Sequence, residues 1–199
     1  MKRRIIPFYY YLAIISFVIM NSCATTSLPS VWMDDKYQGG ALKNILVIGV
    51  IEPQTLRKYF EDELVRQLKI NGIKGVPSYS VLPDEKMPEQ TKIELKIKEL
   101  GMDSVLVARL VDVLDADTYL TYPSYVSSGD FHGYYSLCCQ NIVSAGYNVK
   151  FETKVFEAKN NKLIWSALSE TNLGRSPENM TRSFITAIMK DLYNKKLIQ

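Results

Sequence analysis

The sequence predicts one α/β domain in the order β-α-β-α-β-β-β-α, with a mixed sheet, a C-terminal antiparallel hairpin and helices packed on the sheet. Three patterns predict this class. Residues 44–51 form a continuous apolar run, residues 56–68 repeat apolar side chains every four positions, and residues 147–156 alternate apolar and polar side chains. About 155 residues follow the N-terminal segments, which suffices for one core.

The run NILVIGVI at residues 44–51 is rich in β-branched residues and ends at Glu52-Pro53. Such a run is typical of a strand buried on both faces. An amphipathic helix is predicted next, and it ends at Asn71-Gly72. We expect the acidic cluster Glu61-Asp62-Glu63 on its solvated face. Its apolar stripe is Leu56, Phe60, Leu64 and Leu68.

Three further elements are predicted in the middle of the chain. Residues 76–81 favour a short strand and residues 83–88 a loop. The apolar side chains in residues 90–100 fit both the alternation of a strand and the spacing of a helix. Lys and Glu at the remaining positions, with Gly101 as a stop, favour a helix. Residues 104–113, SVLVARLVDV, predict another strand, so β-α-β-α-β results.

A hairpin and a last helix complete the predicted domain. Apolar and polar side chains alternate in residues 147–156, a turn follows at 159–162, and a matching apolar face continues through 173. The predicted hairpin therefore has one solvent-exposed face. Ser176 and Pro177 then predict a helix start, with serine as the N-cap. Its predicted buried stripe is Met180, Phe184, Ile188 and Leu192.

The N-terminus has the order of a secretory signal. Basic residues at positions 2–4 precede an apolar stretch that ends at Met20, and Asn21-Ser22-Cys23 follow. About 16 apolar residues reach roughly 24 Å, which is short for a bilayer core of about 30 Å. Met20-Asn21-Ser22-Cys23 resembles the lipobox of bacterial lipoproteins. The resemblance implies cleavage of residues 1–22 and lipidation, including palmitate-type chains, on Cys23; an uncleaved anchor and an ordinary signal remain open.

Lipidation would place the protein in the cell envelope. Acyl chains on one cysteine give stable membrane attachment. By resemblance to Gram-negative lipoproteins, Ala24 in place of an aspartate implies the outer membrane, with the domain facing the periplasm. Residues 1–22 hold the excess basic side chains, so the formal charge falls from +3 to zero after cleavage. Neither charge nor export favours a nucleic-acid partner.

Residues 23–40 predict a lipid-anchored tether, and residues 41–199 the α/β domain. The stretch from Ala24 to Gly40 lacks apolar periodicity and ends in two glycines. As a flexible coil it would reach about 20 to 25 Å. Whether Trp32 and Tyr37 pack back onto the domain is left open.

A tyrosine-rich insertion at about residues 114–146 lies between two predicted strands. A gap of this length is far above the usual ~4 to 6 residues and is typical of functional or disordered segments. Exposed tyrosines provide contact area at low entropic cost, so the segment is the candidate partner-binding surface. An extra hairpin with local core aromatics, and one transmembrane hairpin of a pore, are the alternatives. The candidate residues are Tyr119, Tyr122, Tyr125, Phe131, Tyr134 and Tyr135.

The same insertion holds His132 and the pair Cys138-Cys139. Their spacing lacks the separated pairs of structural zinc sites, so we expect no metal. In an oxidising compartment the two cysteines either stay as unconnected thiols or form a disulfide, with each other or with another chain. Asp112, with Asp115 and Asp117 nearby, is expected to be solvated rather than to bind calcium.

The chain carries no common hydrolase or nucleotide-binding motif, so neither an enzyme nor a cofactor is expected. Two stretches, residues 57–84 and residues 149–167, resemble a family of poorly characterised bacterial lipoproteins. Their globular part is similar to the amino-terminal domain of TolB and to CsgG-like and LpoB-like envelope domains. The resemblance implies binding to other envelope proteins or to itself, without catalysis. A subunit of an oligomeric CsgG-like export channel and a carrier of a small apolar ligand are the alternatives.

Overall fold

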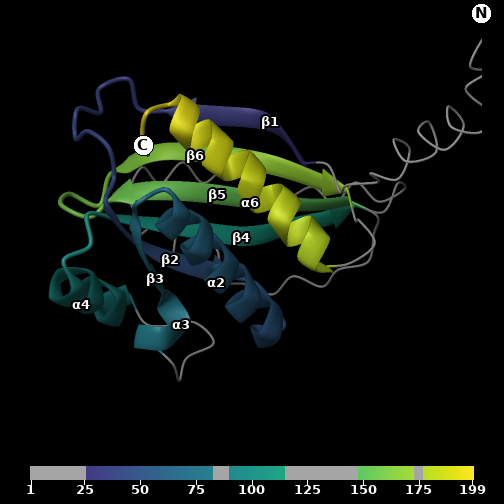
Figure 1. Ribbon diagram of the computed structural model, residues 1–199, viewed down its shortest axis with the longest axis horizontal. Helices are drawn as coiled ribbons and strands as arrows, with labels where there is room; N and C mark the ends of the chain where they lie inside the picture. Colours follow the sequence, from purple (N-terminus) through teal and green to yellow (C-terminus); the bar gives the residue numbers. More distant parts are fainter. Residues whose placement is uncertain (1–25, 83–89, 115–147, 173–176) are drawn as a thin grey trace, which may run out of the picture.

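The computed structural model describes residues 26–82, 90–114, 148–172 and 177–199, and it has the predicted α/β architecture (Figure 1). A six-stranded sheet runs in the order β1-β6-β5-β4-β2-β3. The strands are β1 (Thr26–Met33), β2 (Asn44–Val50), β3 (Lys74–Pro77), β4 (Ser104–Leu114), β5 (Asn148–Glu157) and β6 (Leu163–Asn172). The helices are α2 (Gln54–Ile70), α3 (Ser78–Val81), α4 (Gln90–Leu100) and α6 (Pro177–Asn194).

The sheet is mixed, as predicted. β2 pairs in parallel with β3 and β4, whereas β4, β5, β6 and β1 pair antiparallel in turn. The short strand predicted at residues 76–81 is present as β3, but its bounds are wrong: β3 covers Lys74–Pro77 and α3 follows at once. Pro77 lies opposite Val47 and has no N–H to donate, so the ladder does not continue.

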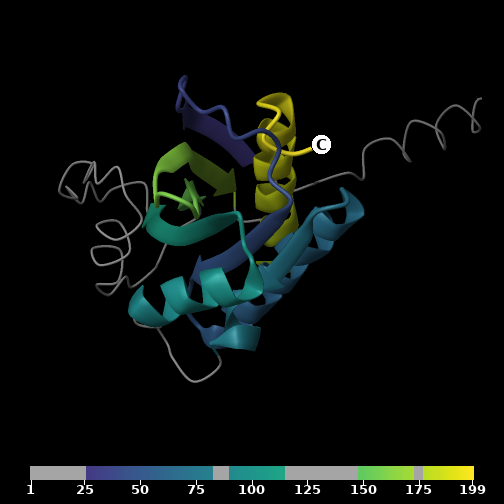
Figure 2. The same cartoon turned by 90° about the vertical axis from the view of Figure 1, so that its left-hand side faces the viewer.

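Helices cover the sheet on two faces. Alternation along β2 sends Ile45 and Val47 into the core that α2 and α6 cover, and Leu46 and Ile48 into the core under α4. Figure 2 shows α2 and α6 together on one side of the strands. The prediction that this strand is buried on both faces is therefore confirmed.

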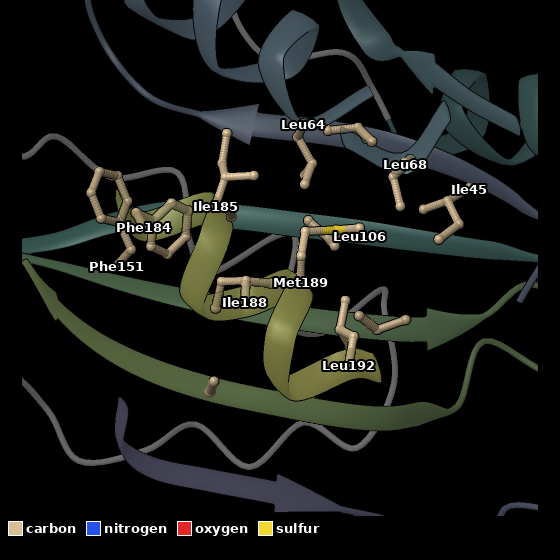
Figure 3. Packing of buried hydrophobic residues seen from close by; sticks show 14 of the residues in the cluster. Ile45, Leu64, Leu68, Leu106, Phe151, Phe184, Ile185, Ile188, Met189 and Leu192 are labelled. Atoms are coloured by element: carbon tan, nitrogen blue, oxygen red, sulfur yellow. The ribbon is translucent and has the colours of Figure 1, made fainter. Parts of the chain in front are cut away.

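The larger core lies between α2, α6 and the sheet (Figure 3). Phe184 of α6 stacks on Phe151 of β5 with ring centroids 4.6 Å apart, and the ring centroid of Phe60 of α2 lies 5.8 Å from that of Phe184. Full burial of each such side chain contributes about 1.5 to 3 kcal/mol. The predicted stripe of the last helix is confirmed, since Met180, Phe184, Ile188 and Leu192 are all buried.

Both predicted glycine stops end their helices. Gly72 has φ 73°, and the N–H of Ile73 donates to the carbonyl of Leu68 at 3.0 Å. Gly101 has φ 62°, and the N–H of Met102 donates to the carbonyl of Ile97 at 3.0 Å. A left-handed residue that turns the chain back onto the last helical carbonyls is the C-terminal cap that glycine favours.

Candidate functional site

The segment predicted as a tether contains the edge strand β1. Thr26–Met33 pairs antiparallel with β6. The hydroxyl of Thr26 lies 2.8 Å from that of Thr171 and donates to Ser183 of α6 at 3.0 Å. Tyr37 is half-buried against the core, and Trp32 is 46% exposed. Apolar alternation is weak in TSLPSVWM, which explains why the sequence did not indicate a strand.

Cys23, the predicted lipidation site, lies outside the described residues. Three residue steps separate it from Thr26, and an extended chain spans at most about 3.6 Å per residue. The sulfur-bearing residue therefore lies within about 11 Å of the start of β1. The predicted flexible tether of 17 residues would have a typical end-to-end distance of about 20 to 25 Å, which is twice this upper limit.

The start of β1 defines what we call the anchor end of the sheet, at the right in Figure 1. β6 ends there at Asn172, because Thr26 pairs with Thr171. β4 ends and β5 begins at the same end, since Leu114 pairs with Asn148. The chain therefore leaves and re-enters the sheet for residues 115–147 at the anchor end.

The other predicted site residues belong to that segment and lie outside the described residues. They are Tyr119, Tyr122, Tyr125, Phe131, His132, Tyr134, Tyr135, Cys138 and Cys139. The structure gives the points where the segment joins the sheet, and nothing about its side chains. Partner binding by the aromatics and a disulfide at the two cysteines stay predictions.

A buried polar cluster that the sequence did not reveal lies at the start of α2. Oε1 of Glu61 accepts hydrogen bonds from Nε of Arg57 at 2.9 Å, the Ser78 hydroxyl at 2.8 Å and the Gly49 N–H at 2.9 Å. Oε2 accepts from the N–H of Tyr79 at 3.1 Å. Arg57, Glu61 and Ser78 are all buried. The carboxylate thus joins β2, α2 and α3, and its oxygens are occupied within the fold.

The predicted solvated face of α2 is therefore wrong at two positions. Glu61 is 0% and Glu63 is 7% exposed, while Asp62 is exposed. Glu63 accepts two hydrogen bonds from Arg66, which lower the pKa of its carboxyl, and the charge of Arg182 on α6 lowers it further. The helix packs on β2, β3 and α6, and the Ser78 hydroxyl and the Tyr79 N–H of α3 reach Glu61, so these polar positions face protein. The i,i+4 spacing of Arg57 and Glu61 was the available signal.

Tyr79 closes a small depression beside this cluster, which Gln54, Arg57 and Lys58 also line. Its volume is about 10 Å³, the space of one water molecule. The phenol donates to Asp62, and this hydrogen bond, with burial, raises the pKa of Tyr79 to about 12. Lys58 lies 5.6 Å from the ring centroid of Tyr79. The volume is far below the few hundred Å³ of usual ligand pockets.

The outer face of the hairpin carries ion pairs, in line with its predicted wet side. Glu152 pairs with Arg109 at 2.8 Å and with Lys154 at 3.0 Å, and Lys150 pairs with Glu170 at 3.0 Å. Burial raises the pKa of Glu152, but the charges of Lys154 and Arg109 outweigh it, so the net shift is downward. The pairs Arg109–Glu152 and Lys150–Glu170 join neighbouring strands and stabilise their register, whereas Glu152 and Lys154 both lie on β5.

Neither a metal cluster nor a membrane-spanning helix is found among the described residues. No group of three His, Cys, Asp or Glu side chains gathers there, and no described helix is long and apolar enough to cross a bilayer. Asp115 and Asp117 lie outside these residues, so the expectation that they do not bind calcium is untested.

The fold and this site define a single α/β domain with a six-stranded mixed sheet, an edge strand close to Cys23 and a long insertion at the same end. No family model and no curated protein matches the chain. Among solved structures it is similar to PelC from Paraburkholderia phytofirmans, a dodecamer, at 14% identity over 85% of this chain and 96% of that chain, with a TM-score of 0.46. It is also similar to lipoprotein GNA1162 from Neisseria meningitidis, at 14% identity over 76% of this chain and 99% of that chain, with a TM-score of 0.42. At these values neither likeness assigns a family or an activity.

Proposed function

We propose that the protein is a lipid-anchored cell-envelope protein that acts as a non-catalytic interaction or assembly module. The observation that carries the proposal is the spacing between Cys23 and β1. A lipid on Cys23 would attach to a strand that is hydrogen-bonded into the sheet three residues later. The domain would then sit directly on the membrane surface, and the lipobox resemblance with Ala24 favours the periplasmic face of the outer membrane.

The interaction role concerns the insertion. Residues 115–147 begin and end at the anchor end, so their aromatic side chains would meet partners close to the bilayer. Tyrosine is favoured both in protein interfaces and at membrane surfaces. Partners in the same membrane, including further copies of this chain, fit that position best.

A non-catalytic role is supported by the buried polar cluster. Glu61 is fully buried, and four donors from β2, α2 and α3 occupy its oxygens. A general acid or base needs a carboxylate within reach of a substrate proton. Glu61 instead stabilises the junction of three elements.

Photo-crosslinking in intact cells tests the interaction role. A probe replaces Tyr134, and a matched probe replaces Thr186, an exposed residue on the outer surface of α6. The proposal predicts a discrete adduct with an envelope protein, or with a second copy, from Tyr134 and not from Thr186. Equal labelling from both positions, or none from Tyr134, would contradict it.

Lengthening the anchor tests the role of the short spacing. About 12 Gly and Ser residues inserted between Ala24 and Thr26 add a flexible reach of roughly 20 Å. If partners lie at the bilayer surface, the Tyr134 adduct weakens while membrane attachment persists. An unchanged adduct would show that the spacing does not position the segment.

A further inference from the structure

Lysines gather at the end of the sheet opposite the anchor end, in the turns 34–43, 69–74, 98–103 and 158–162 and in residues 194–199. These turns lie together: Asn44 pairs with Lys74, the N–H of Asp103 donates to the Asn44 carbonyl at 2.9 Å, and the N–H of Leu42 donates to the Leu197 carbonyl at 2.8 Å. We call this surface the lysine end, and it is at the left in Figure 1. Its exposed lysines are Lys36, Lys43, Lys69, Lys74, Lys98, Lys159, Lys162, Lys195 and Lys196.

Most carboxylates near these lysines form a hydrogen bond or an ion pair with groups other than the nine lysine side chains. Asp103 accepts from the backbone N–H groups of Lys43 and Asn44 at 2.8 and 2.9 Å. Asp191 accepts from the indole of Trp165 at 2.9 Å, and Glu99 pairs with Lys96 at 2.8 Å.

Lys162 is paired with the buried Asp34. The other eight lysines make no ion pair within the described part of the chain. Asp35 and Glu157 are the remaining Asp and Glu side chains at this end. With Glu99 paired to Lys96, nine lysines stand against five acidic side chains there, so the lysine end keeps a positive excess.

Two large apolar side chains are exposed on the same surface. Ile70 at the end of α2 is 66% exposed, and Tyr193 at the end of α6 is 59% exposed. α2 and α6 contact each other and both finish at the lysine end (Figure 1). Protein interfaces typically have apolar and aromatic side chains at the centre and a polar rim around them, as Ile70 and Tyr193 have here with the lysines.

The anchor geometry decides which anionic partner fits. This step rests on the proposed function, because it takes Cys23 as the membrane attachment. β1 has eight residues and runs from the anchor end toward the lysine end, which separates the two ends by about 26 Å. With β1 upright on the bilayer, that distance is about three Debye lengths at physiological salt, so headgroups of the anchoring bilayer are screened from these lysines.

We propose that the lysine end docks an acidic surface of a second envelope protein, with Ile70 and Tyr193 as the apolar contacts. Complementary charge around such anchors speeds association and selects the partner. The interface is distinct from the tyrosine-rich insertion, which joins the sheet at the anchor end. One domain would then connect the membrane surface with a partner held away from it.

Crosslinking from the lysine end in cells tests this proposal on the full-length protein. A photo-reactive residue replaces Asn71, which is exposed beside Ile70. The test variant reverses three charges at this end, K43E, K74E and K196E. The matched control reverses three exposed basic side chains away from this end, K58E, K92E and R182E. We expect a discrete adduct whose crosslinked peptide is rich in Asp and Glu, and about a tenfold lower yield in the test variant than in the control.

Each other outcome overturns the proposal: no adduct, an adduct with lipid or with a second copy, or equal yields in the two triple variants. If the reversed variant does not accumulate, the neutral triple K43Q, K74Q and K196Q replaces it, and about a threefold loss is expected. Acylation of Cys23, read by mass, separates this result from the proposed function. An unacylated Cys23 with the Asn71 adduct intact refutes the anchor alone, whereas an acylated Cys23 without that adduct refutes the lysine end alone.

Discussion

Nε of Arg57 lies 2.9 Å from Oε1 of Glu61, and the two side chains are 6% and 0% exposed. The same oxygen accepts hydrogen bonds from the hydroxyl of Ser78, which begins α3, and from the backbone N–H of Gly49 in β2. The pair therefore fixes α2 against β2, in the parallel part of the sheet. A Cβ on Gly49 would lie 3.1 Å from Phe60, so α2 approaches the strand closely at this point.

Removing the Glu61 carboxylate is predicted to destabilise the domain strongly. Glu61→Ala breaks a buried ion pair and removes the oxygen that accepts from the Ser78 hydroxyl and the Gly49 N–H, which costs about 3 to 5 kcal/mol. Urea unfolding of the detergent-solubilised protein measures the change. Glu99→Gln is the control, because its exposed pair with Lys96 contributes less than about 1 kcal/mol. Similar losses in the two variants would contradict a structural role for the buried pair.

Thr153→Val is predicted to stabilise the protein. Thr153 is 0% exposed in β5, and its hydroxyl has no hydrogen-bond partner within the described part of the chain. Valine has nearly the same shape and removes the cost of burying an unpaired hydroxyl, about 1 kcal/mol. The unfolding midpoint in urea should rise with an unchanged slope. A lower midpoint would mean that the hydroxyl has a partner.

Glu152 is predicted to contribute stability that acid removes. Its pKa is lowered in the folded protein, so its contribution is present above the unfolded value of about 4.5 and is lost as pH falls through the folded value. Glu152→Gln should therefore lower the free energy of unfolding at pH 7, and the difference from wild type should shrink below pH of about 4.5. A difference that stays constant from neutral to acid pH would rule out this linkage.

Tyr79 gives a prediction at alkaline pH. Its pKa is raised to about 12, so the stability that its hydrogen bond to Asp62 contributes is full below the ordinary value near 10 and is lost as pH rises through about 12. Subtracting the ultraviolet titration of Tyr79→Phe from that of wild type should give a midpoint near 12. In Asp62→Asn that midpoint should move back toward 10, and an unshifted midpoint would assign the effect to another group.

Apolar patterns predicted most of the fold. The run at residues 44–51 and the stripe Met180, Phe184, Ile188 and Leu192 took their expected places, because each element buries one or two apolar faces. Two errors share a cause, since neighbouring elements overrode the local pattern. TSLPSVWM has weak periodicity and forms a strand because β6 offers a free edge. Glu61 looks solvated in sequence and is buried because α3 and Gly49 supply its donors.

The candidate site was less accessible to prediction. Lipidation at Cys23 was predicted from its position behind an apolar run, which is a local pattern, and it stays a prediction. The lysine end was missed because its residues come from four turns and residues 194–199, and only the strand pairing and backbone hydrogen bonds bring them together. The formal net charge of the cleaved chain is zero, so a charge count does not reveal that lysines gather at one end of the sheet.

The identity of the mature N-terminus tests the central claim most directly. Protein purified from membranes would be digested, and the mass of its first peptide measured. The account predicts a chain that begins at Cys23 with a diacylglyceryl group on sulfur, and a Cys23→Ala variant that no longer fractionates with the membrane. A mature chain that carries an unmodified Cys23, or that retains residues 1–22, would contradict it.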